Sequence, residues 1–419
     1  MSGPRPSPVI DRGRVARRIE RLAGFTEPDR PYTRRAFSEP YLAARRWLRS
    51  EFEAAGLTTA IDAGGNLVGR RAGAVAGAGT LAAGSHTDTV VGGGRYDGVA
   101  GVVAALEVAQ ALQESRVALR HDLAVYDFLS EEPSDHGASC VGSSALAGSL
   151  PAGMLAAADA DGESLAEALT RVGGEPSRLT GPLPGADALR AFLELHIEQG
   201  PVLERERVPI GVVEGIVAIH RLQLTVRGRA GHAGTTPMAL RRDALVGAAG
   251  VVRDVWERAR ARGGRDGFVA TVGRMQVMPN GANVVPGEVR LVMEARSLDE
   301  AAVAAFLEET RERASEACAA LGLELEAEVT AAAPPVRSDP RLVAALEAAC
   351  EARGIAHRRL SSGAGHDAME VARLAPVGML FVPCRDGLSH NPDEHAEIGD
   401  IAAGAAVMLD ALLRLDEAL

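Results

Sequence analysis

Residues 84–101 read GSHTDTVVGGGRYDGVAG. They follow a short apolar run, residues 80–83, and lead into a stretch rich in alanine and valine, residues 99–112. A buried strand, a glycine-rich loop and a helix in this order are typical of α/β proteins, which place reactive groups on the loops at strand ends. This stretch therefore indicates an α/β protein with a functional site on this loop, although alone its polar residues would also fit an ordinary surface loop.

Three polar side chains of this loop are candidates for that site. His86 and Asp97 offer an imidazole and a carboxylate as metal ligands, and Asp88 is placed to orient a ligand imidazole from outside. The glycines at 92–94 allow a tight excursion of the chain between them. A dinucleotide-binding fingerprint starting at Gly92 is excluded, because it would need glycine at position 97.

The composition argues against several classes of protein. A chain of 419 residues is longer than one hydrophobic core usually supports, so we expect two domains. The formal net charge of −11 argues against nucleic acid or an anionic membrane as a partner. No apolar run approaches the ~20 residues of a membrane span. All 45 basic residues are arginine, which excludes Schiff-base and Walker-type chemistry that depends on lysine.

Two features favour the cytoplasm. The first residues, MSGPRPSPVIDRGR, contain no apolar signal core. The four cysteines, at positions 140, 318, 350 and 384, lack CxxC spacing and fit reduced thiols. We therefore expect a cytoplasmic protein.

Strand-like and helix-like segments alternate in the first half of the chain and return near its end. Helical spacing covers residues 9–24, 39–56, 99–115, 339–353 and 398–416, and strand-like runs include 66–69, 80–83, 121–128, 191–197 and 375–383. The alternation predicts an α/β domain with a doubly wound, mostly parallel sheet. Residues 1–211 and 332–419 are expected to form this larger, discontinuous domain.

Residues 212–331 have a different pattern. Strand-like runs at 212–219, 221–228, 268–278, 287–295 and 322–330 enclose helices at 239–262 and 299–321. This βαββαβ order predicts an inserted α+β domain of the ferredoxin-like kind. Pro334 and Pro335 then mark a linker that returns to the larger domain.

Acidic and imidazole side chains recur at the predicted strand ends of the larger domain. They are His86, Asp97, Glu131, Glu132, His196 and His390. The carboxyl ends of parallel strands converge in space, so five of these groups could hold two divalent metal ions with Asp97 between them. Nitrogen and oxygen ligands without thiolate suit Zn²⁺, Mn²⁺ or Co²⁺. One of the two adjacent glutamates could bind metal while the other transfers protons.

Each of these residues also has an ordinary structural interpretation. A Glu-Glu pair is usually solvated, His196 between Leu195 and Ile197 could be a core histidine, and His390 before Asn-Pro could belong to a turn. Their coincidence at five separate strand ends favours the metal site.

Longer motifs make the chain resemble a known family. They include YTRRAF (32–37), GNLVGRR (65–71), LHIEQGPVLE (195–204), GRAGHAGTTPMALRRDA (228–244), NVVPG (283–287), SGAGHDA (362–368) and GLSHNP (387–392). With the histidine-aspartate loop, they resemble the metal-dependent amidohydrolases of the aminoacylase/carboxypeptidase superfamily. LHIEQGPVLE and GHAGTTPM are the more specific motifs. They point to the branch that contains N-carbamoyl-L-amino-acid hydrolases, allantoate amidohydrolases and β-ureidopropionases.

The resemblance implies a role for each candidate ligand. His86 and His196 would bind one metal ion, Glu132 and His390 would bind the other, and Asp97 would bridge the two. Two divalent ions, Zn²⁺, Mn²⁺ or Co²⁺, are thus expected in each subunit. In such relatives the peptide bond after the bridging aspartate is often cis, so a cis bond is expected between Asp97 and Gly98.

The resemblance also implies how the substrate is handled. Glu131 would be the general base, and His232 of the inserted domain would stabilise the developing oxyanion. Asn283 and Arg296 would grip the substrate carboxylate, for which an arginine supplies a two-pronged donor. The remaining pocket residues would be Gln199, Gly363 and Gly365.

Two departures from the family pattern affect the substrate assignment. Pro133-Ser-Asp-His136-Gly stands where relatives commonly carry glycine and then an aromatic residue, and Glu294 stands where an aspartate is usual. The expected reaction is hydrolysis of an N-carbamoyl-L-amino acid to the amino acid, ammonia and CO₂. Allantoate, ureidoglycolate and N-carbamoyl-β-alanine remain alternative substrates. A peptidase is less expected, and a metal-free binding protein least.

The resemblance implies an assembly as well. The inserted domain of these enzymes forms a homodimer and acts as a lid, and His232 would serve the site of the neighbouring subunit. Gly211 and the Pro334-Pro335 segment would be the hinges of closure.

Overall fold

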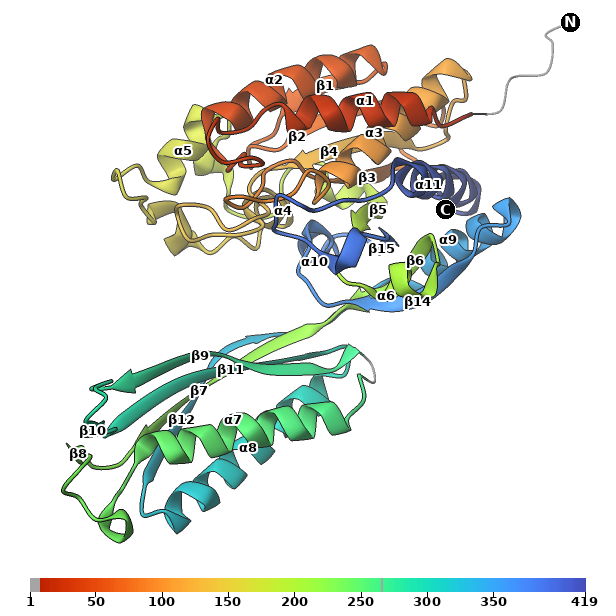
Figure 1. Cartoon of the computed structure of the whole chain (residues 1–419). Coiled ribbons are helices and arrows are strands. Elements are labelled where there is room, and N and C mark those ends of the chain that lie inside the picture. Colours follow the sequence, from red (N-terminus) through yellow and green to blue (C-terminus); the bar gives the residue numbers. More distant parts are fainter. Residues whose placement is uncertain (1–7, 265–266) are drawn as a thin grey trace, which may run out of the picture. The chain divides into compact units, whose positions relative to one another are not determined.

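The computed structural model describes residues 8–264 and 267–419, which divide into two compact units (Figure 1). The larger unit takes in the described residues up to Glu214 together with 338–360 and 365–419, and the smaller unit takes in those of 215–337 together with 361–364. The predicted insertion, 212–331, falls in the smaller unit apart from residues 212–214. Among the described residues, no helix is both long and apolar enough to cross a membrane.

The described residues of the larger unit are organised around a sheet of nine strands, although β13 and the ends of β6 and β14 belong to residues of the smaller unit. Its order is β1-β2-β4-β3-β5-β15-β6-β13, with β14 also paired to β6. The strands are β1 (Thr58–Ile61), β2 (Leu67–Arg71), β3 (Thr80–His86), β4 (Asp122–Phe128), β5 (Leu189–Ile197), β6 (Ile210–Ile216), β13 (Val336–Arg337), β14 (His357–Ser362) and β15 (Val377–Val382). The central strands β4, β3, β5 and β15 are parallel. The outer strands β1, β2, β6 and β13 pair antiparallel. The predicted parallel sheet is therefore confirmed at its centre.

Helices cover both faces of this sheet. They are α1 (Arg12–Ala23), α2 (Glu39–Ala54), α3 (Val99–Glu114), α4 (Val141–Ala147), α5 (Leu165–Arg171), α6 (Val202–Glu206), α9 (Pro340–Arg353), α10 (Asp367–Val371) and α11 (Ile398–Ala418). The alternate strand residues that meet α3, α9 and α11 form one large apolar core, while α4 and α10 contact β4, β5 and β15. Because both faces are covered, β3 and β15 are buried along their whole length.

The carboxyl ends of the parallel strands lie at one edge of the sheet. His86, the last residue of β3, is paired with Phe128, the last residue of β4. His196 of β5 is likewise paired with Phe381 of β15. The loops that follow these strands therefore leave the sheet side by side, and apart from His86, His196 and Gly365 they contain the predicted site residues of this unit.

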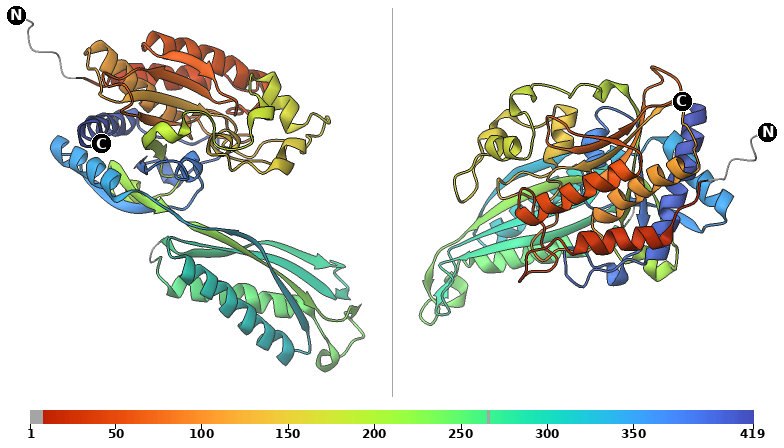
Figure 2. Two further views of the ribbon diagram at one scale, coloured as in Figure 1. Left: turned by 180° about the vertical axis from the view of Figure 1, so that it is seen from behind. Right: turned by 90° about the horizontal axis from the view of Figure 1, so that it is seen from above.

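The smaller unit has the βαββαβ order that the sequence predicts. Its elements are β7 (Ala218–Arg227), β8 (Gly231–His232), α7 (Ala244–Ala261), β9 (Val269–Met278), β10 (Val284–Val285), β11 (Glu288–Ser297), α8 (Glu300–Ala320) and β12 (Glu324–Ala333). The four long strands form an antiparallel sheet of order β12-β7-β11-β9. Helices α7 and α8 lie along one face of it (Figure 2) and share its apolar core.

Helix α7 begins later than predicted. The sequence pattern starts a helix at 239, but a short 3-10 turn occupies Met238–Leu240 and the helix begins at Ala244. Asp243 is the N-cap, and its side chain accepts a hydrogen bond from the backbone N–H of Leu245. A capping aspartate satisfies a free N–H at a helix start, which fixes the boundary there.

Candidate active site

The five predicted metal ligands lie together at the carboxyl edge of the parallel strands. They form two groups, His86–Asp97–His196 and Asp97–Glu132–His390, and within each group the possible ligand atoms lie within 4.8 Å of one another. Asp97 belongs to both. Its Oδ1 is 3.0 Å from Nε2 of His196, and its Oδ2 is 3.1 Å from Nε2 of His390. One carboxylate oxygen thus faces each group, which is the arrangement of a bridging ligand.

Backbone carbonyls orient the two histidines that end buried strands. Nδ1 of His86 lies 3.0 Å from the carbonyl oxygen of Asp88, and Nδ1 of His196 lies 2.9 Å from that of Ile197. A carbonyl oxygen only accepts hydrogen bonds, so each Nδ1 carries the hydrogen and each Nε2 is turned to the site. This is how metal-binding histidines are usually held. The three imidazoles and two carboxylates therefore fit divalent ions such as Zn²⁺, Mn²⁺ or Co²⁺.

Neighbouring carboxylates raise the pKa values of two histidines of the metal-free site. Burial favours the neutral imidazole of His196, but the hydrogen bond and charge of Asp97 outweigh it and raise the pKa of His196 to about 9. Hydrogen bonds with Asp97 and Glu132 raise the pKa of His390 to about 10. Burial would raise the pKa of Asp97, yet the histidines hold that pKa well below its usual range.

These pKa values predict a pH-dependent metal affinity. Below about pH 9 His196 and His390 are mostly protonated in the metal-free protein, and each must lose its proton to bind a metal. Metal binding at pH 7 should therefore release protons, and affinity should rise with pH until both groups are neutral. Calorimetric titration of chelator-stripped protein in buffers of different ionisation enthalpy measures this release. A binding enthalpy that is the same in every buffer would contradict it.

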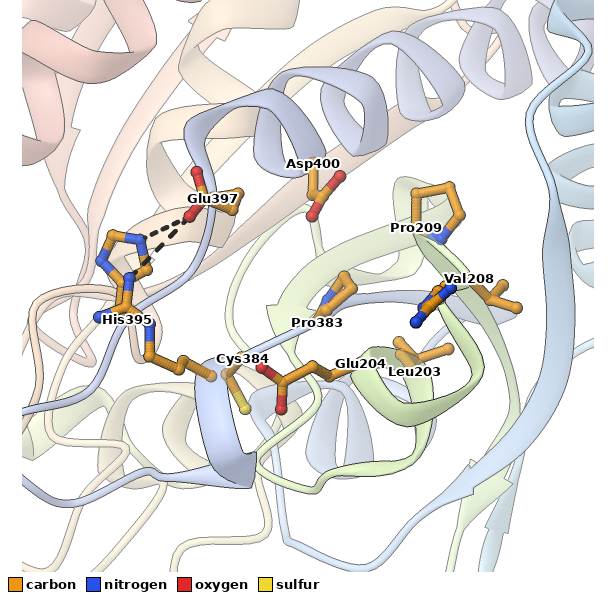
Figure 3. A pocket seen from close by; sticks show the side chains of 11 residues that line it. Leu203, Glu204, Val208, Pro209, Pro383, Cys384, His395, Glu397 and Asp400 are labelled. Atoms are coloured by element: carbon orange, nitrogen blue, oxygen red, sulfur yellow. Dashed lines mark hydrogen bonds and ion pairs between the residues drawn. The ribbon is translucent and has the colours of Figure 1, made fainter.

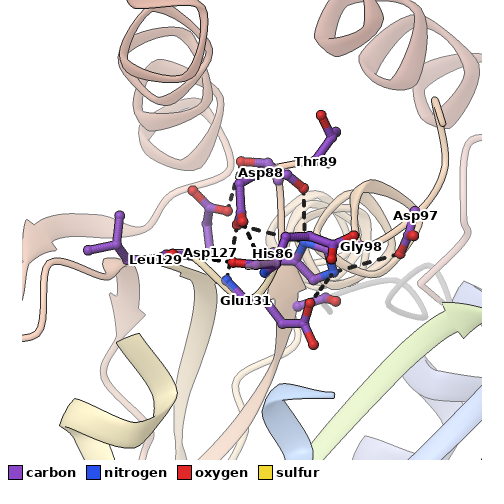
Figure 4. A network of polar contacts seen from close by, with 12 residues as sticks. His86, Asp88, Thr89, Asp97, Gly98, Asp127, Leu129 and Glu131 are labelled. Carbon is purple, nitrogen blue, oxygen red and sulfur yellow. Dashed lines mark hydrogen bonds and ion pairs between the residues drawn. The ribbon is translucent and has the colours of Figure 1, made fainter. Parts of the chain in front are cut away.

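Asp88 makes different contacts from those predicted. Its carboxylate is 3.8 Å from Nδ1 of His86, too far to orient that ring. Instead it accepts hydrogen bonds from the backbone N–H groups of Glu131, at 3.3 Å, and Glu132, at 3.1 Å (Figure 4). The carbonyl group of Asp88 holds His86, and its carboxylate holds the loop that carries the two glutamates.

The peptide bond between Asp97 and Gly98 is not cis, contrary to the prediction. The described cis bonds are Pro31–Tyr32 and Met278–Pro279. The chain turns after Asp97 through a hydrogen bond from the N–H of Val99 to the carbonyl of Asp97, with Gly98 at φ 64°. A side chain at Gly98 would also collide with the ring of His86. Both the backbone conformation and the lack of space therefore require glycine at this position.

The two adjacent glutamates point to different partners. Oε1 of Glu132 is 3.1 Å from Nε2 of His390. Oε2 of Glu131 is 3.6 Å from Nε2 of His86, and its Oε1 accepts a contact from the thiol of Cys140 at 3.7 Å. Burial, followed by the charges of Asp367 and Glu132, raises the pKa of Glu131 well above its usual range. Such a carboxyl group is suited to take up and return a proton once nearby cations bring its pKa down.

Polar groups that the sequence did not connect with Asp97 support its carboxylate and its backbone. Oε1 of Glu394 accepts hydrogen bonds from the backbone N–H groups of Tyr96 and Asp97, at 2.8 and 3.1 Å. The Ser389 hydroxyl and the Gln199 amide both lie within hydrogen-bond distance of Oδ2 of Asp97. Gln199, predicted as a pocket residue, is therefore in direct contact with the bridging carboxylate. The sequence signal was PDEHAE, which directly follows GLSHN.

Further buried groups lie behind the histidines and were also missed. Glu194 accepts hydrogen bonds from the Ser85 hydroxyl and the N–H of Ala368. The His366 ring packs edge-on against His196, with centroids 4.5 Å apart. Asp367 accepts a hydrogen bond from Ser143. Both His366 and Asp367 belong to the motif SGAGHDA, for which the resemblance implies a role of Gly363 and Gly365 only.

The predicted substrate-binding residues of the smaller unit fall into two places. His232 pairs with Val284 between β8 and β10, and the carbonyl of Asn283 accepts the N–H of Ala233, so His232 and Asn283 are neighbours. Arg296 lies near the C-terminal end of β11, which is the end farther along the chain from Asn283. It pairs with Ile219 of β7 and bonds to Glu294 and to the carbonyl of Gly363. A strand of this length spans about 30 Å. Within one chain, therefore, Arg296 is not brought together with His232 and Asn283.

His232 is exposed and has one ring nitrogen available. Its Nδ1 accepts a hydrogen bond from the N–H of Gly234 at 3.0 Å, so the neutral ring carries its hydrogen on Nε2. The side chain can thus donate a hydrogen bond outward from the end of the smaller unit.

A separate pocket in the larger unit contains none of the predicted site residues. Its volume is about 280 Å³, and its lining comes from α6, the turn after it, and residues 383–400 (Figure 3). The charged groups around it have nearby partners: His395 is 3.0 Å from Glu397, and Glu204 accepts the N–H of Asp386. The predicted catalytic and metal-binding residues of the larger unit thus lie around Asp97 and not in this pocket.

The sequence model of peptidase family M20/M25/M40 matches residues 82–414, which include all the predicted metal ligands. The chain belongs to this family. Its members depend on metal ions, and the two ligand groups around Asp97 are the candidate metal sites of this member.

Several relatives match nearly the whole chain and show which members of the family it resembles. An N-carbamoyl-L-amino-acid amidohydrolase of Paenarthrobacter aurescens is 39% identical over 404 residues, covering 96% of this chain and 98% of that protein. A ureidoglycolate hydrolase of Oryza sativa subsp. japonica is 36% identical, covering 97% and 85%. The crystal structure of an amidase of the hydantoinase/carbamoylase family from Burkholderia multivorans is 38% identical. It aligns with a TM-score of 0.89 over 98% of each chain.

Proposed function

We propose that this protein hydrolyses the ureido (N-carbamoyl) group of an N-carbamoyl-L-amino acid, yielding the amino acid, ammonia and CO₂. The observation that carries the proposal is Asp97, whose two carboxylate oxygens face separate histidine-containing groups beside the buried Glu131. The full-length similarity to an N-carbamoyl-L-amino-acid amidohydrolase supports the substrate class.

The ligands would hold two divalent ions per subunit, Zn²⁺, Mn²⁺ or Co²⁺. His86 and His196 would bind one, Glu132 and His390 would bind the other, and Asp97 would bridge them. When bound, such a pair polarises a carbonyl group and lowers the pKa of water. Glu131 would take a proton from the attacking water and return it to the leaving nitrogen.

Arg296 would recognise the substrate carboxylate, together with Gln199 and the backbone of Gly363 and Gly365. Glu294 contacts both Arg296 and Arg221. These contacts hold the Arg296 side chain in a defined direction, which favours a two-pronged contact with a carboxylate.

Replacing Arg296 with glutamine should lower kcat/KM for a carboxylate substrate about 100-fold, because a charged hydrogen-bond partner is lost. Arg290 lies on the same strand and pairs with Glu288, so Arg290→Gln is a matched control with little expected effect. Steady-state kinetics on an N-carbamoyl amino acid and on its carboxamide analogue measure the selectivity. An equal loss on both substrates would mean that Arg296 does not bind the carboxylate.

His232 and Asn283 would act on the site of a second subunit in an obligate homodimer formed through residues 212–331. Their separation from Arg296 along β11 supports this arrangement. Exposed apolar side chains of the smaller unit, Met238, Leu240, Val246 and Trp256, are available for such an interface. The same residues would meet their copies across a two-fold axis. Gly211 and Pro334-Pro335 would then act as hinges that bring the recognition residues onto the substrate.

A substrate panel tests the proposal. Metal-loaded protein is offered N-carbamoyl-L-amino acids, ureidoglycolate, allantoate, N-carbamoyl-β-alanine and dipeptides, and ammonia release or peptide cleavage is measured. The highest kcat/KM is expected for an N-carbamoyl-L-amino acid. Ureidoglycolate is the second candidate, favoured by the 36% identity to a ureidoglycolate hydrolase. Turnover of dipeptides alone would overturn the proposal.

We also propose a cytoplasmic location. All four cysteines are unpaired thiols, and three of them are buried. Free thiols are typical of proteins kept in a reducing compartment.

A further inference from the structure

A third cluster of possible metal ligands lies in the larger unit outside the site around Asp97. It consists of His136, from the loop between β4 and α4, and of Asp159 and Glu163, from the turn before α5. Their possible ligand atoms lie within 4.8 Å of one another. The cluster shares no residue with the two groups around Asp97.

His136 is the unusual member of this cluster. The residue is 6% exposed, and in the described structure neither ring nitrogen has a hydrogen-bond partner. Leaving a buried polar group without a partner is unfavourable, so such a group usually serves a purpose. The Phe37 ring meets the imidazole edge-on, with centroids 5.4 Å apart, and this contact helps to fix the ring.

The two carboxylates are held in place by other groups. Oδ1 of Asp159 accepts hydrogen bonds from the N–H groups of Asp161 and Glu163, each at 2.9 Å. Glu163 is bonded at both oxygens by Arg171, at 2.8 and 2.7 Å. Ligating carboxylates are commonly oriented by outer hydrogen bonds of this kind. Two carboxylates and one arginine give this cluster a net negative charge, which favours the binding of a cation.

The loop of His136 is also structurally defined. Ser134 N–H donates to the carbonyl of Ala138 at 2.8 Å, and Gly137 N–H donates to that of Ser134 at 2.9 Å. The loop directly follows Glu131 and Glu132. A bond between His136 and the turn before α5 would therefore hold in place the loop that follows Glu131 and Glu132.

We propose that His136, Asp159 and Glu163 form a divalent-cation site, separate from the pair of ions proposed around Asp97. One imidazole nitrogen and two carboxylate oxygens suit Zn²⁺, Mn²⁺ or Co²⁺, and water completes the coordination. The bound ion gives the His136 nitrogen its missing partner. Its role is to clamp the loop after Glu132 to the start of α5.

Metal counting on the full-length protein tests this site. The chain is saturated with Zn²⁺, desalted and analysed by mass spectrometry for zinc per chain. His136→Ala should hold roughly one equivalent less than wild type. His357→Ala, which removes a partly buried histidine of β14, is the matched control and should hold the wild-type amount. Because the readout is a difference, it is independent of how many ions the site around Asp97 binds.

A second variant guards against misfolding of the first. Asp159→Asn keeps the Oδ1 acceptor for the two backbone N–H groups but loses the negative charge, and it should lose the same equivalent. Zn²⁺ should also raise the Tm of wild type more than that of either variant. Wild-type zinc content and an unchanged Zn²⁺-dependent Tm shift in both variants would overturn the proposal. A zinc anomalous peak between these three side chains would establish it directly.

Discussion

Glu131→Gln is expected to lower kcat about 1,000-fold while leaving the bound metal unchanged. Glutamine keeps the size and shape of the side chain and can still accept the contact from Cys140, but it cannot take up a proton. Glu131 lies outside both ligand groups, so the loss should fall on the proton transfer alone. Steady-state kinetics and metal analysis on the same preparation measure the two quantities.

Glu132→Gln is the matched comparison, because it makes the same chemical change one residue away. Glu132 belongs to the group with Asp97 and His390. Its substitution should therefore lower the metal content as well as the activity. If Glu131→Gln loses metal and Glu132→Gln does not, the two glutamates have exchanged roles.

The grouping of the candidate metal ligands could be predicted because strand ends are readable in the sequence. A mostly apolar run with a histidine at or near its end marks the end of a buried strand, as for His86 shortly after residues 80–83 and for His196 near the end of 191–197. Parallel pairing of β3, β5 and β15 then brings these ends together. The inference needed only the direction of the strands, and not the details of the loops.

The supporting groups could not be predicted in the same way. Glu194 lies inside a buried strand, where its partner Ser85 belongs to a different strand and Ala368 to a distant helix. For Asp88, the sequence could not decide whether carboxylate or carbonyl would meet His86, because this depends on the backbone path of the loop. Glu394 bonds to Tyr96 and Asp97 across almost 300 positions of the chain.

The length of the predicted strand 287–295, in contrast, can be read from the sequence. It places Arg296 and Asn283 far apart. The two lie 13 positions apart across one predicted strand, and an extended chain advances about 3.3 Å per residue. A single site in one chain could not readily use both. The structure agrees, because it pairs Arg296 with Ile219 and Glu288 with Arg227 at opposite ends of β11.

A heterodimer of variant chains is expected to be active only when one subunit keeps Glu131 and the other subunit keeps His232. If His232 acts across the interface, a dimer of one His232→Ala chain and one Glu131→Gln chain has one site with both groups intact. The other site lacks both. Such a dimer, isolated with two different affinity tags, should have about half the activity of wild type, although each parent homodimer is nearly inactive.

The reverse pairing provides the control that makes the test decisive. A heterodimer of a wild-type chain with a chain carrying both substitutions has Glu131 in one site only, and the partner of that site carries the His232→Ala substitution. It should therefore be nearly inactive if His232 acts across the interface, but half active if His232 serves its own chain. The two arrangements thus predict opposite results for the same pair of heterodimers. Activity in the wild-type/double-variant dimer, with none in the dimer of single variants, would place His232 in the site of its own subunit.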